Sequence, residues 1–417
     1  MFPDIVTENQ RNNIKERFIM STIKVGVVGV KRGMTFIKLL QTFGDVACLH
    51  AICDNHPEYA KEPLPEGVKV YADYDEFLDS GIDAVVLCNF FHEHAAFAIK
   101  ALEKNIHVLS ETTAAPTLGE CVKLCRTAEK SKAKYMLGAN VPFKRGLQFM
   151  KKEIQEGKIG DVFYGEAEYL HHNDSAPGWP DGANHWRRKM PGTYYNMHTL
   201  GPLMYMSDSV PRKVSASVIR VGDRAKRTNR LIDHCGAKIL CEMDNGAKFD
   251  FTACAYWGPT SKWFRLIGDK GVLETERYTE SHVVFVGSGE EFVPGESTGN
   301  IEFYDPKYED LNMAPKEEFE TFTEEQMRLG HNGIDFWLTL YFIKYINGEH
   351  EPFFNVYRAT ALSAAGILGW RSIKNGNREF EIPDFSNEEE RKKYENDFYS
   401  PFADEDSEYY ISGYVND

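Results

Sequence analysis

The first third of the chain alternates short apolar runs with amphipathic stretches. The apolar runs are rich in β-branched residues and cover residues 23–30, 46–54, 83–89, 106–111 and 133–140. Between them, residues 34–44, 92–105 and 118–132 show the spacing of helices with one apolar face. Strands that alternate with helices through short connections form a parallel sheet, and covering both of its faces makes such strands apolar throughout. We therefore predict an α/β domain with a parallel sheet over residues 23–142.

The second half shows a different pattern, in which strands follow one another directly. A helical stretch at 146–160 precedes strand-like runs at residues 161–172, 212–221, 237–244, 247–257, 262–269 and 271–277. Asp244-Asn245-Gly246 has the residue types of a tight hairpin turn. This pattern predicts a C-terminal α+β domain over residues 143–385, with a large, mainly antiparallel sheet and closing helices that pack back on the first domain. Residues 1–22 are then an N-terminal extension, and residues 386–417 a C-terminal tail.

The first strand runs into glycines, as in dinucleotide-binding domains of the Rossmann type. Gly26 and Gly29 allow a tight turn, after which the N-terminal amides of the next helix face a pyrophosphate. The Gly-x-Gly-x-x-Gly fingerprint is broken, because Lys31 stands at its second glycine and Gly33 comes one place early. In this interpretation Lys31 or Arg32 supplies positive charge to the pyrophosphate. The alternative is a plain strand-turn-helix connection that binds no cofactor.

A carboxylate marks the end of the second strand, at Asp54. At this place in the unit a carboxylate accepts hydrogen bonds from the hydroxyls of the adenosine ribose and repels a 2′-phosphate. Asp54 therefore predicts NAD, rather than NADP, as the cofactor.

Charge and cysteine use limit the class of partner. The formal net charge of −15 argues against nucleic acid, whose phosphates require a basic protein face. The chain has no apolar run of about 18 residues, the length that a membrane span requires. Its polar start lacks the apolar segment of a secretory signal. The 8 cysteines show no Cys-x-x-Cys spacing. We expect free thiols in a reducing, cytoplasmic setting.

Two stretches carry a resemblance to a known family. Residues 92–111, HEHAAFAIKALEKNIHVLSE, resemble a strand-helix-strand segment of the Gfo/Idh/MocA family of glucose–fructose oxidoreductase and inositol dehydrogenase. Residues 330–385 are similar to the closing helices of that family. The resemblance covers about residues 23–385 and implies NAD-dependent chemistry on a sugar or polyol.

One branch of the family is more similar than the others. Residues 190–206, MPGTYYNMHTLGPLMYM, resemble a segment of the NAD-dependent glycosidases that act on α-N-acetylgalactosaminides, and HWRR at 185–188 and IPDF at 382–385 match the same branch. The resemblance implies that NAD stays bound through turnover. It implies oxidation of the sugar at C3, which makes the C2 proton acidic, then elimination of the aglycone and reversal of the steps.

The resemblance also implies roles for individual residues. His198 matches the catalytic histidine, Tyr195 the tyrosine three places before it, and Arg187 or Arg188 a substrate-binding arginine. Glu111 matches the glutamate after the fourth strand. On a helical turn Tyr195 and His198 share one face, and an imidazole titrates in the range that a general base needs. The alternatives are that Tyr195 only packs in the core, and that His198 is a hydrogen-bonded histidine at the start of a helix.

Two positions depart from the family pattern. Ordinary dehydrogenases of the family carry Glu-Lys-Pro where this chain has Glu111-Thr112-Thr113, so the lysine that assists proton transfer at the alcohol is missing. The glycosidase branch lacks this lysine too, which favours that branch. Phe143 stands where the branch has a tyrosine, so specificity for α-N-acetylgalactosaminides does not follow from the resemblance.

Further candidates come from the ends of strands and from a loop rich in glycine and proline. Asn89 ends the third strand and His94 opens the next helix, beside the nicotinamide by resemblance; capping or packing is the alternative for the histidine. Trp179 and Trp186 are candidates to lie against a sugar face, with surface packing as the alternative, and His171 ends a strand close to them in sequence. The histidines lack ligand-like spacing, so we expect no metal.

Three functions stay open at this point. The first is a sugar-active enzyme that oxidises a hydroxyl with bound NAD, as a step of redox-neutral glycoside cleavage. The second is a plain NAD-dependent sugar or polyol dehydrogenase, and the third is a protein that binds NAD or sugar without catalysis. We expect a small carbohydrate as partner and a homo-oligomer, a dimer or tetramer. The acidic, aromatic tail is expected to dock on a neighbouring subunit or on its own domain, with a solvated tail as the alternative.

Overall fold

The computed structural model describes residues 22–44, 46–60, 62–171, 185–220, 234–254, 260–277, 282–287, 300–311, 313, 319 and 321–415. Of the predicted site residues, Trp179 lies outside the described residues. The chain forms two compact units, each made of segments that are not continuous in sequence. Unit 1 comprises Met1–Thr112, Arg126–Phe143 and Asn312–Val356, and unit 2 comprises Thr113–Cys125, Lys144–Leu311 and Tyr357–Asp417.

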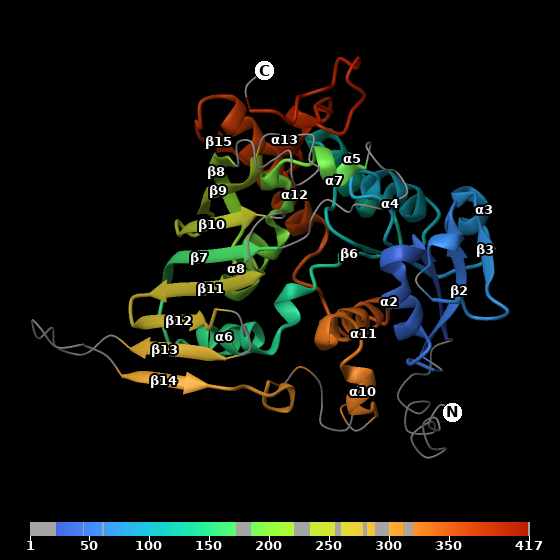
Figure 1. The fold of residues 1–417 in the computed structure, drawn as a ribbon, viewed down its shortest axis with the longest axis horizontal. Helices are drawn as coiled ribbons and strands as arrows, with labels where there is room; N and C mark the ends of the chain where they lie inside the picture. Colours follow the sequence, from blue (N-terminus) through green and yellow to red (C-terminus); the bar gives the residue numbers. More distant parts are fainter. Residues whose placement is uncertain are drawn as a thin grey trace, which may run out of the picture. The chain divides into compact units, whose positions relative to one another are not determined.

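Unit 1 is built on a parallel six-stranded sheet with the order β3-β2-β1-β4-β5-β6 (Figure 1). The strands are β1 (Ile23–Val28), β2 (Ala47–Cys53), β3 (Lys69–Tyr71), β4 (Ala84–Leu87), β5 (His107–Ser110) and β6 (Tyr135–Leu137). Every residue of β4 is buried, as expected for a strand with both faces covered. The predicted parallel α/β domain is therefore confirmed. The short edge strand β3 was not predicted, because it is largely exposed and carries no apolar run.

The helices of unit 1 cover this sheet. They are α2 (Val30–Leu40), α3 (Tyr74–Leu78), α4 (His94–Glu103), the second half of α5 (Leu118–Lys130), α10 (Glu324–Met327) and α11 (Ile334–Ile346), with 3-10 turns η1 (Pro57–Tyr59), η2 (Val141–Phe143) and η7 (His331–Gly333). α11 packs against α2 and is buried over most of its circumference. Asp335, in its first turn, is fully buried among these apolar residues.

Unit 2 contains a nine-stranded sheet with the order β14-β13-β12-β11-β7-β10-β9-β8-β15 (Figure 1). The strands are β7 (Val162–Leu170), β8 (Pro211–Arg220), β9 (His234–Met243), β10 (Lys248–Cys254), β11 (Ser261–Gly268), β12 (Gly271–Thr275), β13 (Val283–Gly287), β14 (Ile301–Tyr304) and β15 (Phe380–Glu381). Only the pair β7 and β10 is parallel among these neighbours. The prediction of a large, mainly antiparallel sheet is therefore confirmed.

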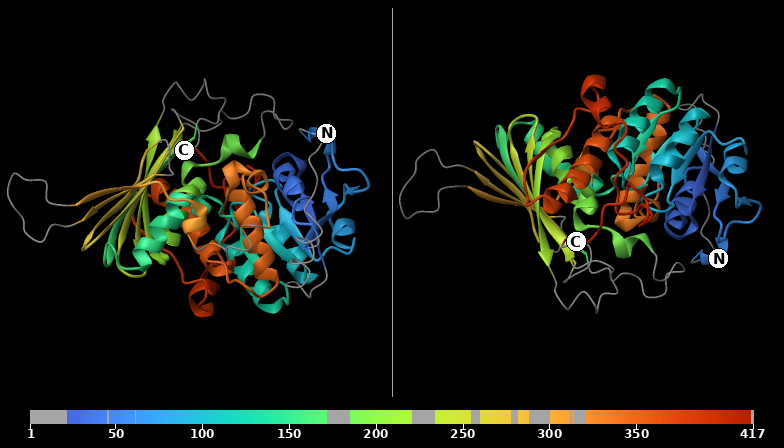
Figure 2. Two further views of the ribbon diagram at one scale, coloured as in Figure 1. Left: turned by 90° about the horizontal axis from the view of Figure 1, so that it is seen from below. Right: turned by 90° about the horizontal axis from the view of Figure 1, so that it is seen from above.

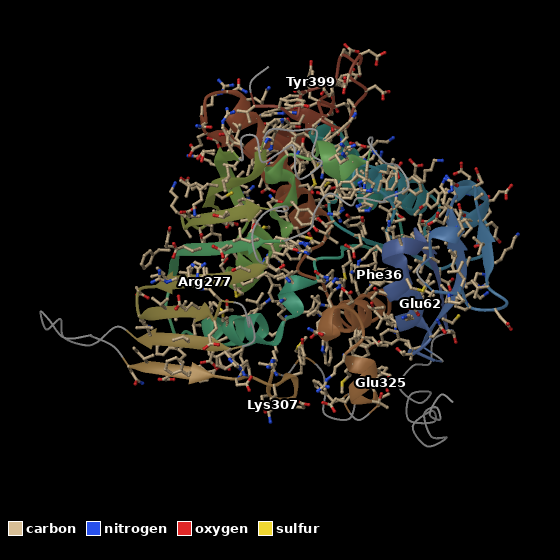
Figure 3. All side chains as sticks on the ribbon, in the orientation of Figure 1. Phe36, Glu62, Arg277, Lys307, Glu325 and Tyr399 are labelled. Atoms are coloured by element: carbon tan, nitrogen blue, oxygen red, sulfur yellow. The ribbon has the colours of Figure 1, made fainter. Side chains whose placement is uncertain are left out.

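The two faces of this sheet differ in chemistry. Tyr169 of β7 is buried, whereas Glu166 and Glu168 alternate with it and lie on the opposite face. There Arg265 pairs with Glu166 at 3.0 Å, and Arg277 donates to Glu168 at 2.9 Å (Arg277 is labelled in Figure 3). One face of the sheet is therefore charged and part-exposed, and the other packs into the unit.

Helices cover the second, packed face. The helical segments of unit 2 are α6 (Arg145–Gln155), α7 (Trp186–Lys189), η4 (Gly192–His198), α8 (Leu200–Ser207), η6 (Tyr308–Asp310), α12 (Val356–Lys374), α13 (Glu388–Arg391) and η8 (Lys392–Tyr394). Figure 2 shows the sheet nearly edge-on, with α6 and α8 on the same face. Among the described helices, none is long and apolar enough to cross a lipid bilayer.

The C-terminal tail packs on its own unit. Arg371 of α12 forms a bidentate ion pair with Asp397, whose carbonyl oxygen also accepts a hydrogen bond from the Gly119 amide at 2.8 Å. The Trp370 indole donates to the carbonyl oxygen of Ser412 at 3.2 Å. Docking on its own domain is therefore the alternative that the structure shows for the described part of the tail.

Candidate functional site

The turn after β1 depends on Gly29. Its φ is +85°, which side chains disfavour, and an added Cβ would lie 2.6 Å from the carbonyl oxygen of Cys88. Gly33 has a second role, because an added Cβ there would lie 2.7 Å from Cγ1 of Val27. Gly33 therefore lets α2 lie close to β1, which is the task of the third glycine in the fingerprint. The four-residue spacing of the two glycines is the signal that could have identified it.

Gly26 lies elsewhere than predicted. It sits inside β1 rather than in the turn, and an added Cβ would lie 2.3 Å from the ring of Phe77. Gly26 thus makes room for a buried ring of α3, and Gly29 makes the turn. A cofactor contact at Gly26 stays a prediction.

Asp54 follows β2 directly and lies at the glycine turn. Its Oδ2 accepts a hydrogen bond from the Val30 amide at 2.7 Å, and its Oδ1 accepts one from the His56 amide at 2.7 Å. Val30 is the first residue of α2, so the carboxylate stands at the positive end of that helix. The structure therefore brings together the two residues, Gly29 and Asp54, on which the prediction of a dinucleotide site rested.

Arg32 holds a network of ion pairs within unit 1. Its guanidinium contacts Glu111 at 2.6 Å and makes a bidentate pair with Asp335, at 2.9 and 3.0 Å. It also lies 4.9 Å from the ring centroid of Phe36, which is labelled in Figure 3. The charge of Arg32 is thus balanced by two carboxylates of this chain. A contact of Arg32 or of the half-buried Lys31 with a pyrophosphate stays a prediction.

Asp335 is a buried carboxylate with several hydrogen-bond partners, and the sequence analysis did not predict it. Besides Arg32, its carboxylate accepts hydrogen bonds from Nδ2 of Asn140 at 2.9 Å and from Nδ1 of His331 at 2.7 Å. Burial alone would raise the pKa of this carboxyl, but the hydrogen bond from His331 and the charge of Arg32 outweigh it and hold the pKa far below its usual range. A lone acid inside the apolar run of α11 is the signal that could have identified it.

Polar atoms that follow β4 and β6 fit a ligand with hydrogen-bond donors. Asn89 donates to Glu93 at 3.2 Å, yet its buried Oδ1 accepts no hydrogen bond from the described residues, and the buried Oδ1 of Asn140 is in the same state. Buried acceptors of this kind are costly unless a donor reaches them. With the Gly29 turn and Asp54, they suit the amide and hydroxyl groups of a dinucleotide. His94 is buried in the first turn of α4, and its predicted cofactor contact is untested.

Tyr195 and His198 lie together on η4. This segment is a 3-10 helix with a kink at Tyr195, and a 3-10 helix places residues i and i+3 above one another. The two ring centroids are 5.0 Å apart and nearly perpendicular. Asn196 anchors the segment by donating to the carbonyl oxygen of Leu362 at 3.0 Å. The structure therefore brings the predicted pair together, by a tighter helix than the α-helical turn that was expected.

Tyr169 joins this pair from β7. Its ring centroid lies 4.6 Å from that of His198, 5.9 Å from that of Tyr195 and 5.6 Å from that of His171. Burial, followed by the charge of Tyr195, raises the pKa of Tyr169 well above its usual value, so its phenol keeps its proton. Tyr169 was not predicted, although the alternation along β7 places it on the same face as His171.

The arginine and tryptophan candidates on α7 lie at the edge of this cluster. The Arg187 guanidinium stacks 4.5 Å above the ring centroid of Trp186 and lies 5.7 Å from that of Tyr195. His185 caps the helix by accepting from the Arg187 amide at 3.2 Å. Of the two arginine candidates, Arg187 is the one that the structure places beside the tyrosine, and for Arg188 a substrate contact stays a prediction.

The segment after β5 supplies no amine. Thr113 shares a 2.6 Å hydrogen bond between its hydroxyl and that of Ser363, and Ser363 also accepts from the Ala114 amide at 3.2 Å. Thr112 stands at the position where the resemblance led us to look for a lysine. Among the described residues, no group of three or more His, Cys, Asp or Glu side chains could hold a metal ion.

Comparisons with known proteins cover nearly the whole chain. Residues 23–139 match the oxidoreductase family with NAD-binding Rossmann fold (GFO_IDH_MocA), and residues 147–274 match the GFO/IDH/MocA C-terminal domain. These two matches together span more than half of the chain. The chain belongs to the Gfo/Idh/MocA family. Residues 242–392 also match the C-terminal domain of glycosyl hydrolase 109, so the predicted family and branch resemblance are confirmed.

Curated relatives come from the glycosidase branch of this family. A glycosyl hydrolase family 109 protein of Shewanella pealeana is 26% identical over 411 residues, which cover 88% of this chain and 86% of the relative. An α-N-acetylgalactosaminidase of Shewanella oneidensis is 24% identical with the same coverage.

Solved structures show the same family fold. An oxidoreductase of Agrobacterium radiobacter in complex with NAD+, L-tartaric acid and magnesium has a TM-score of 0.65 and 18% identity, and the match covers 87% of this chain and 99% of that one. A UDP-N-acetylglucosamine 3-dehydrogenase of Acidithiobacillus ferrooxidans has a TM-score of 0.62 and 17% identity, with coverage of 84% and 96%. Unit 1 contains most of the residues that match the NAD-binding Rossmann domain of the family, among them the residues named above that fit the cofactor.

Proposed function

We propose that this chain is a glycosidase that uses NAD, held through turnover, to cleave a glycoside without net oxidation. When bound, NAD supplies the hydride acceptor for a sugar carbon and returns the hydride at the end of the cycle. The matches to the glycosyl hydrolase 109 branch support this proposal over a plain dehydrogenase. The expected cytoplasmic location and the dimeric or tetrameric assembly stay predictions.

The contact of His198 with two tyrosines carries the proposal. A neutral imidazole can take the proton of a sugar hydroxyl, and its ring lies against Tyr195 and Tyr169, at 5.0 and 4.6 Å between centroids. Since the pKa of Tyr169 is raised by burial, its phenol acts as a hydrogen-bond donor and not as the base. In this proposal His198 is the base, because the chain has Thr112 at the position where the dehydrogenases that it resembles carry a lysine.

An assay of the purified protein without added cofactor tests the proposal. The protein is denatured, the supernatant is assayed for NAD by mass spectrometry, and intact protein is mixed with aryl glycosides. We expect close to one NAD per chain and release of the aryl alcohol without added NAD, because the cofactor is recycled in each turnover.

The competing functions give different results in the same assay. Accumulation of NADH with free sugars, and no release of the aryl alcohol, would establish a dehydrogenase instead. Bound NAD with neither activity would establish a binding protein.

A further inference from the structure

A lysine stands on the packed face of the nine-stranded sheet, where apolar side chains are the rule. Lys262 of β11 pairs in register with Tyr169 of β7, and its side chain alternates with that of Trp263 on the opposite face. Its Nζ lies 5.5 Å from the ring centroid of Tyr169. Phe264 and Leu266 follow on the same face and are fully buried. Lys262 thus directs an amine toward the ring that contacts His198.

A second lysine meets it from another element. Lys144 is the N-cap residue of α6, and its side chain is hydrogen-bonded to that of Lys262. An ammonium group has three donors and no acceptor, so a hydrogen bond between two amines requires one of them to be neutral. Burial, then the neighbouring charge of Lys262, lowers the pKa of Lys144 to about 6. Burial also lowers the pKa of Lys262.

Other basic groups converge on the same ring. Arg187 acts on Tyr169 with its positive charge, and His171 and His198 contact that ring directly. The acidic residues of β7 are directed away, because Glu166 and Glu168 pair with arginines on the opposite face of the sheet. A protein with a net charge of −15 therefore gathers basic side chains at its candidate substrate site.

We infer that Lys144 and Lys262 form a subsite for an anionic substituent of the sugar, a carboxylate or a sulfate group. Two adjacent amines can both donate to the oxygens of one oxyanion, and charge-assisted hydrogen bonds of this kind are the strong ones. Lys262 and His198 both contact the buried ring of Tyr169, which places the subsite close to the proposed base. The inference rests on the proposed function only in taking the bound molecule to be a sugar.

Because the two amines share a proton, the binding of an anion at the subsite is expected to depend on pH. With a pKa of about 6, Lys144 is mostly neutral at pH 7.5. An oxyanion favours two charged amines and raises the pKa of Lys144, so binding takes up as much as one proton. Among the described residues, His171, His198, Arg187 and Tyr169 are further titratable or charged groups that face the same space.

Isothermal titration calorimetry on the NAD-loaded protein tests the subsite. The probes are D-glucuronate, D-galacturonate and the 6-sulfates of glucose and galactose, each against the parent neutral sugar. We expect at least one anionic sugar to bind at least ten-fold more tightly than its neutral parent. Which probe does so shows whether the subsite prefers a carboxylate or a sulfate. Titrations in buffers of different ionisation enthalpy are expected to show uptake of about one proton at pH 7.5.

Variants that keep the aliphatic stem isolate the amines. Lys262→Met and Lys144→Met are each expected to abolish the preference for the anion, and Lys144→Met also the proton uptake. Lys238→Met is the matched control, because Lys238 is exposed on the outer face of β9, where it pairs with Asp250. Near-UV circular dichroism and NAD content verify that each variant is folded.

Equal affinity for anionic and neutral sugars would overturn the inference, as would a full anion preference in both lysine variants. Release of an aryl alcohol from neutral glycosides would leave the proposed function intact in that event. Conversely, anion preference without any cleavage would support the subsite and overturn the glycosidase.

Discussion

Replacing His198 with alanine is expected to lower kcat roughly 10²–10⁴-fold, the contribution that a positioned general base or acid makes. The imidazole is the group that takes and returns the proton of the sugar hydroxyl in this account, and its neighbours cannot replace it. Tyr169 keeps its proton because burial raises its pKa, and Thr112 provides no amine.

The measurement is the steady-state release of the aryl alcohol by the NAD-loaded variant. His282→Ala is the matched control, because His282 is a part-exposed histidine of unit 2 that pairs with Glu276. We expect the control to keep the wild-type rate, and both proteins to keep their NAD. Full activity in His198→Ala would refute the role of the imidazole.

Replacing Arg32 with methionine is expected to lower the free energy of unfolding by about 3–5 kcal/mol at pH 7, the usual cost of removing one partner from a buried ion pair. Asp335 is fully buried, so among the described residues its charge would keep only Asn140 and His331 as partners. Glu111 would lose its 2.6 Å contact at the same time. The Arg32→Met variant is also expected to bind NAD less tightly, because Arg32 joins α2 to the segments that carry Glu111 and Asp335.

Urea unfolding at several pH values checks this prediction. In the wild type the pKa of the Asp335 carboxyl is lower in the folded than in the unfolded chain, so its contribution is present above about pH 4, near the unfolded pKa, and is lost as pH falls. In the variant Arg32 no longer opposes the effect of burial, so the Asp335 carboxyl is expected to have a higher pKa than in the wild type, and its protonation is expected to relieve part of the loss of stability. The stability difference between the two proteins is therefore expected to shrink as pH falls from 7 to 4.

Arg277→Met is the control for the stability measurement. Arg277 is 45% exposed and pairs with Glu168 on the outer face of the sheet, so its loss is expected to cost less than about 1 kcal/mol. An Arg32 variant no less stable than this control would contradict the account of the network.

Periodicity was enough to predict both sheets. Strand and helix alternation identified the parallel sheet, and successive strands around Asp244-Asn245-Gly246 identified the antiparallel one. In each case the signal is local, because the burial of one or both faces of a strand determines which of its consecutive residues are apolar. Tyr195 and His198 were predictable for the same reason, since three residues of separation bring them together on any helical turn.

Contacts between distant segments were not predictable in the same way. Arg32 and Asp335 are separated by most of the chain, and no local pattern joins a glycine-loop arginine to α11. Weaker signals did exist. Lys262 shares the parity of Phe264 and Leu266 along β11, and a charged residue at a core-facing position of a strand indicates a site. Lys144 carries no such signal, because its meeting with Lys262 depends on how α6 packs on the sheet.

The exchange of hydrogen at C2 of the released sugar tests the central claim most directly. The NAD-loaded protein cleaves an aryl glycoside in D₂O without added cofactor, and the sugar is analysed by NMR. Oxidation at C3 makes the C2 proton acidic, so this account predicts solvent deuterium at C2 and hydrogen retained at C3. Cleavage with C2 fully protiated would contradict it, because direct hydrolysis leaves that carbon untouched.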